Sequence, residues 1–172
     1  MLRVLVTCLI AVLPAVALAQ SSCAIASEVE RAIQAQYPDF RRAVFEDLSL
    51  DDQKLWRGKW GHTCPTVVAF ANPRRLALML VARSAKKFSL VSYSKPSRNS
   101  TPQLSAVVEG SYASPPVIRP LNASIVRMIN RKTKPHACPP YRKENAVVLE
   151  FIESAISVYS VEKAGCGTVL IE

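Results

Sequence analysis

The sequence lacks most of the residues and patterns on which enzymes rely. It contains only two histidines, His62 and His136, so side chains that act as bases near neutral pH are scarce. No serine lies in the Gly-x-Ser-x-Gly pattern of a hydrolase nucleophile elbow. The carboxylates at Asp51-Asp52, Glu150 and Glu153 have no spacing that identifies an acid and base pair. The sequence therefore favours a protein without catalytic activity, and we expect no cofactor.

A hydrophobic run long enough to cross a membrane is also absent. The longest run, Val4–Leu18, is shorter than the roughly 20 residues that a transmembrane helix needs. It follows the basic Arg3 and ends at small residues, which is the arrangement of a cleavable secretory signal. We therefore predict a signal peptide at 1–19, a single α+β domain at 20–172 and a secreted or periplasmic location. No transmembrane span is expected after cleavage.

Acidic residues are few. The sequence has 13 Asp and Glu but 22 Lys and Arg, which gives a net charge of +9. The densest positive segment contains no acidic residue and carries Arg127, Arg131, Lys132, Lys134, Arg142 and Lys143. An exported basic surface attracts anionic envelope polymers, lipid headgroups or acidic proteins, whereas the compartment argues against nucleic acid. The alternative is that the segment is a solvated loop and that spread positive charge maintains solubility.

Four cysteines follow the predicted signal, at Cys23, Cys64, Cys138 and Cys166. In an oxidising compartment an even set of cysteines favours disulfides over metal binding or catalysis. Four cysteines allow three pairings, and the sequence does not choose among them. We take Cys64–Cys138 with Cys23–Cys166 as the working pairing, which ties the first strand to the basic loop and the first helix to the last strand.

A zinc site is the competing interpretation of the same residues. The segments His62-Thr63-Cys64 and His136-Ala137-Cys138 supply two imidazoles and two thiolates, a set that suits tetrahedral zinc. However, ligands two residues apart depart from the usual spacing of structural zinc sites, and oxidation consumes free thiols. We therefore expect disulfides and no metal.

Two helices are predicted in the first sixty residues. Apolar residues recur every fourth position and predict a helix over 24–36, with Ser27 and Glu30 as its capping box. Ser49 offers a cap for a short helix over 50–57 that stops near Gly58, where Asp51 and Asp52 favour the start electrostatically. Trp56 and Trp60 then lie one turn apart and are expected to pack together.

The remainder of the chain is predicted to be mostly strand. Runs rich in Val, Leu and Phe predict a three-stranded meander over 66–71, 76–83 and 88–94, to which 103–109 could add a fourth strand. Three closing strands are predicted over 146–152, 155–161 and 167–171. Prolines 115, 116 and 120 are expected to break regular structure, and a short amphipathic helix is expected over 122–130. The predicted fold is α+β, with an amino-terminal helix packed on a mostly antiparallel meander sheet.

The run Cys64–Phe70 followed by Leu76–Leu80 resembles a hairpin of small exported bacterial proteins of uncharacterised function. The tail Val147–Tyr159 is similar to their closing strands. In those proteins the hairpin turn is often acidic and glycine-rich, like the calcium-binding turn of FG-GAP and VCBS-type repeats. Here the turn is Asn72-Pro73-Arg74-Arg75, which offers no carboxylate to a hard cation. The resemblance implies a fold and a compartment, and this departure argues against calcium.

The leading hypothesis is an exported, non-enzymatic protein held by two disulfides that acts through its basic surface on an anionic envelope component or an acidic partner. Two other classes stay open. Compact disulfide-tied domains also serve as inhibitors of exported enzymes, and a small hydrolase would have to use His62 or His136 as its base.

Overall fold

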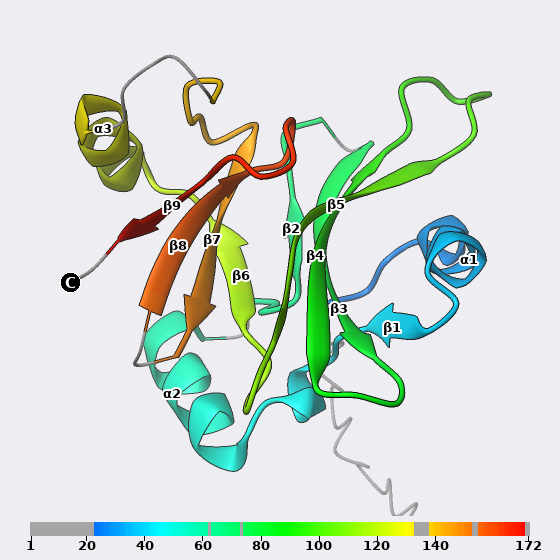
Figure 1. Cartoon of the computed structure of the whole chain (residues 1–172), viewed down its shortest axis with the longest axis horizontal. Coiled ribbons are helices and arrows are strands. Elements are labelled where there is room, and N and C mark those ends of the chain that lie inside the picture. Colours follow the sequence, from blue (N-terminus) through cyan, green and yellow to red (C-terminus); the bar gives the residue numbers. More distant parts are fainter. Residues whose placement is uncertain (1–22, 62, 73, 133–137, 153–154, 171–172) are drawn as a thin grey trace, which may run out of the picture.

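Two antiparallel sheets, stacked face to face, form the centre of the protein (Figure 1). The computed structural model describes residues 23–61, 63–72, 74–132, 138–152 and 155–170. Sheet A contains β1 (Phe40–Arg42), β2 (Val67–Ala69), β3 (Arg75–Ala82), β4 (Lys87–Ser94) and β5 (Gln103–Ser111). Sheet B contains β6 (Val117–Pro120), β7 (Ala146–Phe151), β8 (Ala155–Ser160) and β9 (Gly167–Leu170). The helices are α1 (Ser27–Gln36), α2 (Leu50–Trp60) and α3 (Ala123–Lys132), with a short 3-10 helix η1 at Phe45–Asp47.

The main hydrophobic core fills the space between the sheets. Sheet A contributes Met79 and Leu90, and sheet B contributes Ile118, Val147 and Leu149. Because successive side chains of a strand point to opposite faces, the alternate residues of each strand face away from this core. Each sheet therefore has a second, outer face that must be covered separately.

Helix α1 covers the outer face of sheet A (Figure 1). Its Val29 and Ile33 pack on Leu78, Leu80 and Val91, and all five side chains are buried. This confirms the predicted amino-terminal helix, although its cap differs from the prediction. Ala26 is the N-cap residue and no side chain caps the helix. Ser27 is the first helical residue instead.

Helices α2 and α3 both cover the outer face of sheet B (Figure 1). Ile129 of α3 packs on Val148, and Trp56 of α2 packs on Val117. The predicted cap of α2 is confirmed, since the Ser49 hydroxyl accepts a hydrogen bond from the Asp52 N–H at 3.1 Å. The helix runs past Gly58 and ends at Trp60. Its C-cap residue is Gly61, whose φ of 65° is a backbone conformation that glycine adopts readily.

The sheet prediction is confirmed in kind, because the fold is α+β and antiparallel strands form at the seven predicted positions. Residues 67–111 form the expected meander, in the order β2, β3, β4, β5. Three elements were not predicted: β1, η1 and β6. The expectation that prolines break regular structure before residue 121 is wrong, since β6 pairs with β7 and places Pro120 opposite Val147. The strands also form two sheets and not one.

The disulfides differ from the pairing expected from the sequence, which was Cys64–Cys138 with Cys23–Cys166. Cys23 bonds Cys64, and Cys138 bonds Cys166. The first bond ties the segment before α1 to the segment before β2, and the second ties the loop before β7 to the start of β9. The sequence separations are 41 and 28 residues. The chain-entropy model gives on the order of 4 kcal/mol of stabilisation for each.

Candidate functional site

The predicted basic segment lies at the end of α3 and in the loop that leads to β7. Arg127 is exposed on α3, and Arg142 and Lys143 are exposed in the loop. Arg131 and Lys132 belong to the last turn of α3, where positive charge complements the partial negative charge of a helix end. Their side chains, and the whole of Lys134, lie outside the described part of the structure.

Two tethers hold the basic loop against the protein. Tyr141 is buried, and its backbone exchanges two hydrogen bonds with the Asn130 side chain of α3, at 3.0 and 3.1 Å. The Cys138–Cys166 disulfide fastens the same loop to β9. Arg127 lies one turn before Asn130 on the same side of α3. The tethers therefore bring the cations of the helix and of the loop to one end of the molecule.

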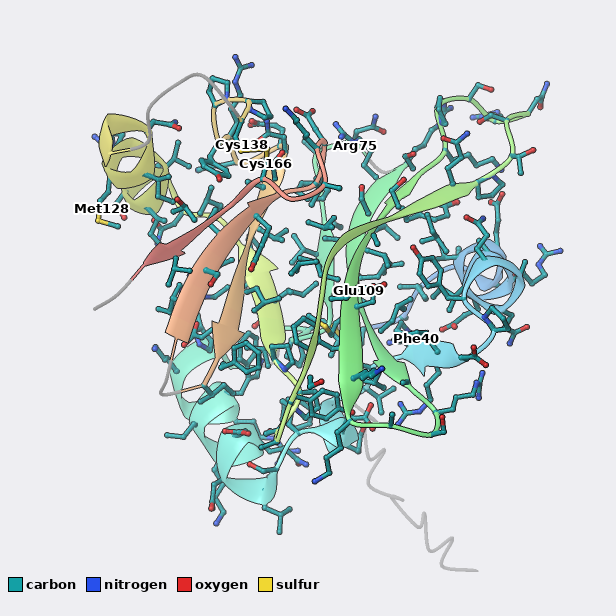
Figure 2. All side chains as sticks on the ribbon, in the orientation of Figure 1. Phe40, Arg75, Glu109, Met128, Cys138 and Cys166 are labelled. Atoms are coloured by element: carbon teal, nitrogen blue, oxygen red, sulfur yellow. A yellow bond between two sulfur atoms is a disulfide. The ribbon has the colours of Figure 1, made fainter. Side chains whose placement is uncertain are left out.

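Arg75 extends this basic end, and Glu162 interrupts it. Figure 2 shows Arg75 beside Cys138 and Cys166 at one end of the sheets. The Glu162 carboxylate accepts a hydrogen bond from Arg75 at 3.1 Å and another from Asn145 at 3.0 Å. Partial burial alone raises the pKa of Glu162, but hydrogen bonds from Asn145 and Arg75 and the nearby charge of Arg142 lower it overall. The segment that is free of acids in sequence thus lies near the Glu162 carboxylate in space, and Glu144 follows it directly in the chain.

A second cluster of charge is buried on the outer face of sheet B, between β6, β7 and α2. Arg119 and Glu150 are 8% and 4% exposed, and Arg119 Nε donates to Glu150 Oε2 at 3.0 Å. Glu150 lies opposite Val117 in the register of β6 and β7. Both charged residues point away from the core between the sheets, because their neighbours Ile118 and Leu149 point into it.

The last turn of α2 completes this buried cluster. The Arg119 guanidinium lies over the Trp60 ring, 4.7 Å from its centroid. Lys59 Nζ lies 3.6 Å from Glu150 Oε1 and 5.4 Å from the Trp60 centroid. Trp56 and Trp60 pack with ring centroids 5.9 Å apart, which confirms the predicted aromatic pair. One helical turn therefore supplies both a cation and an aromatic surface to the Arg119–Glu150 pair.

The two histidines considered as bases or zinc ligands, His62 and His136, both lie outside the described residues. Within the described ranges, no three His, Cys, Asp or Glu side chains gather as they would around a metal ion. Cys64 and Cys138 are bonded to other cysteines and are not thiolate ligands. The carboxylates Asp51 and Asp52 lie in the first turn of α2, and Asp52 accepts a hydrogen bond from Ser114.

Comparison of the chain with protein-family models, with curated proteins and with solved structures found no match. The resemblance to small exported bacterial proteins stays a prediction. In the described part of the chain, no helix has the length and apolar character of a membrane span. The function of this protein is therefore inferred from its own residues.

The Arg119 cluster was missed by sequence reasoning, although two signals were present. An arginine follows Val117-Ile118, and Glu150 ends the apolar run from Ala146, so each charge interrupts an otherwise buried strand. A charged residue inside an apolar strand either ends the strand or is buried with a partner. The partner lies 31 residues away, a distance that local patterns do not bridge.

Proposed function

We propose that this protein is an exported, non-enzymatic binding protein that recognises an anionic envelope component or an acidic partner through its basic surface. The basic surface is defined by Arg127, Arg131, Lys132, Lys134, Arg142 and Lys143. The observation that carries the proposal is the double tethering of the 138–145 loop, by Asn130 and by the Cys138–Cys166 disulfide. The tethers hold the cations of the loop beside those of α3.

Charge and rigidity favour binding in different ways. The excess of cations attracts an anionic surface from a distance, and salt screens this attraction. The tethers reduce the entropy that the loop loses when it binds. The two disulfides and the absence of a membrane-spanning helix among the described residues are compatible with the secreted or periplasmic location that the signal predicts. The anionic partner is the proposed ligand, whether a polymer, a lipid headgroup or a protein.

A matched pair of variants tests this proposal. The first replaces Arg127, Arg142 and Lys143 by serine. The control replaces Arg83, Lys86 and Lys87, which are exposed around the β3–β4 turn at the opposite end of the sheets, so both variants lose three charges. Binding to vesicles of phosphatidylglycerol and phosphatidylcholine, and to polyglutamate, is measured by sedimentation between 20 and 300 mM NaCl, chosen to span about 20 to 6 Å of Debye length.

Each basic residue near an anionic surface contributes about 1 kcal/mol, so the first variant is expected to lose about 100-fold in affinity at low salt. The control is expected to lose less than about 5-fold, because only its net charge changes. Equal losses in the two variants contradict a localised binding surface. Undiminished binding of the first variant to every probe contradicts the proposal as a whole.

A further inference from the structure

Arg119 uses only part of its hydrogen-bonding capacity. Its Nε donates to Glu150, whereas Nη1 and Nη2 donate to none of the described residues. In the described part of the chain, the fully buried side-chain atoms without a hydrogen bond are Arg42 Nη1 and Tyr141 Oη. The terminal nitrogens of Arg119 are not among them and therefore reach solvent. A residue that is 8% exposed thus presents unused donors at the protein surface.

The guanidinium group is held in place before any ligand arrives. The Trp60 ring lies against one face at 4.7 Å, and the Glu150 carboxylate fixes the Nε edge. Stacking and hydrogen bonding leave the planar fork of Nη1 and Nη2 with little rotational freedom. A fork of this kind binds an oxyanion through two parallel hydrogen bonds and loses little entropy in doing so.

The charges of the cluster do not cancel. Two basic residues, Arg119 and Lys59, share the single acidic residue Glu150. Lys59 is 63% exposed and marks the side on which the cluster opens to solvent. A ligand with a single negative charge neutralises the cluster. A doubly charged ligand leaves an excess of negative charge in a largely buried place, which is costly.

We propose that the Arg119 fork is a binding site for a carboxylate group, with Lys59 at its rim and the Trp60 ring as its side wall. The charge of the cluster suits a ligand with one negative charge. The two terminal nitrogens of the fork suit a ligand that accepts two parallel hydrogen bonds. It lies on the outer face of sheet B under α2 and does not include any residue of the basic surface. The carboxylate belongs to a small organic acid, an acidic side chain or a peptide terminus.

Acetate and inorganic phosphate serve as probes in an NMR titration of the oxidised protein at pH 8, with NaCl holding the ionic strength constant. The indole N–H signal of Trp60 reports on the site. The indole of Trp56, which donates to the Thr63 carbonyl at 3.0 Å, is the internal reference. We expect a saturable Trp60 shift with acetate at a dissociation constant on the order of 10 mM, as suits so small a ligand. Phosphate should bind at least about 3-fold more weakly, because it is largely a dianion at this pH.

Three variants sharpen the titration. R119K keeps the charge beside Glu150 but removes the fork, and is expected to weaken acetate binding at least about 10-fold. K59Q is expected to weaken it about 3-fold. The control K54Q changes an exposed lysine of the same helix, which pairs with Asp51, and should leave the affinity unchanged. Circular dichroism of each variant checks its fold.

A Trp60 shift that never saturates, or that R119K and K59Q leave unchanged, overturns the site. Tighter binding of phosphate than of acetate overturns the carboxylate assignment. If R119K does not fold, the Nη–H signals of Arg119 in the unaltered protein carry the test together with K59Q. Acetate must then shift those signals. Loss of acetate binding with intact binding to anionic vesicles separates this site from the basic surface.

Discussion

The outer faces of the two sheets bury different kinds of residue. Under α1, sheet A presents an apolar surface that includes Leu78 and Leu80, and its charged pair lies at the margin, where Arg42 binds the partly exposed Glu30 at 2.9 Å. Under α2, sheet B places Arg119 and Glu150 within the buried surface itself. Both faces are covered by a helix of similar length, yet only on sheet B are both partners of an ion pair buried.

This difference separates residues that stabilise the fold from residues that need another explanation. Apolar burial stabilises by about 25 cal/mol for each Å² removed from water. A buried ion pair loses hydration on both partners, and well-packed apolar residues often stabilise a protein as much or more. The face under α1 is therefore accounted for by stability. The pair on sheet B is not, which is why we assign a binding role to it.

The largest predicted effect comes from breaking the buried pair. Arg119→Met leaves the Glu150 carboxylate without its main partner, and we expect a loss of about 3–5 kcal/mol in the free energy of unfolding. The double variant Arg119→Met/Glu150→Met should recover to within about 1 kcal/mol of the unaltered protein. Urea unfolding of the oxidised protein at pH 7 measures both.

Arg42→Met is the matched control on sheet A. Its partner Glu30 has a side chain that is 40% exposed and regains water when the arginine is removed. We therefore expect a loss of about 1 kcal/mol or less. Equal losses for Arg42→Met and Arg119→Met are incompatible with the contrast between the two faces.

A smaller effect is predicted for two glycines that each lie under an aromatic ring. Gly110 faces Phe88 across sheet A, and a Cβ there lies 2.8 Å from Phe88 Cε1. Gly167 faces Tyr159 in the same way across sheet B. Phe88 is buried and packs edge-on against Phe151 at 5.8 Å, whereas Tyr159 is only partly buried.

We expect Gly110→Ala to cost about 2–3 kcal/mol and Gly167→Ala to cost about 1 kcal/mol, because overpacking is costly where the neighbouring side chain cannot yield. Thermal unfolding of the two variants gives the comparison. The reverse order is evidence that the edge of sheet B at β9 is packed more tightly than the edge of sheet A at β5.

The last predictions concern one carboxylate near each sheet. Asp47 accepts hydrogen bonds from both terminal nitrogens of Arg41, at 2.5 and 2.7 Å, and from the Val44 N–H at 2.8 Å. Burial alone raises the pKa of Asp47, but these hydrogen bonds lower it below the usual value. A lowered pKa in the folded state means that the stabilisation is present above about pH 4 and is lost as the pH falls through the folded-state value.

Asp47→Asn should therefore cost about 1–2 kcal/mol at pH 7, and this difference should shrink toward zero below about pH 3. Glu162→Gln should show the same trend but cost only about 0.5 kcal/mol, because the Glu162 side chain is 40% exposed and its ion pair is screened by water. Urea unfolding at pH 7 and pH 2.5 measures both. A cost of Asp47→Asn that is independent of pH contradicts the role of its charge.

Local patterns predicted nearly every helix and strand of this fold. A strand that buries alternate residues, or a helix that buries about every fourth residue, carries apolar residues at that spacing in its sequence. They failed where the structure depends on distant partners. Strand β6 was missed since prolines surround it, yet Pro120 is tolerated at the end of a strand on the edge of sheet B. The division into two sheets was missed for the same reason, because strand periodicity does not say which strands pair.

The candidate sites follow the same rule. The basic residues around α3 were found because they are close together in the sequence, and charge can be counted there. The contact of Arg75 with Glu162 joins residues 87 positions apart, and no spacing indicates it. The burial of Arg119 was equally hidden, because it depends on where α2 lies against sheet B.

The disulfides have a consequence for the order in which the chain acquires its bonds. The two loops that they close, 23–64 and 138–166, follow one another and neither encloses the other. A chain that leaves the cytoplasm amino end first therefore brings each cysteine out immediately before or after its native partner. An oxidant that joins thiols in order of arrival forms Cys23–Cys64 and then Cys138–Cys166. For a chain exported in this way, with the predicted signal at 1–19 removed, this order needs no shuffling of wrongly joined cysteines.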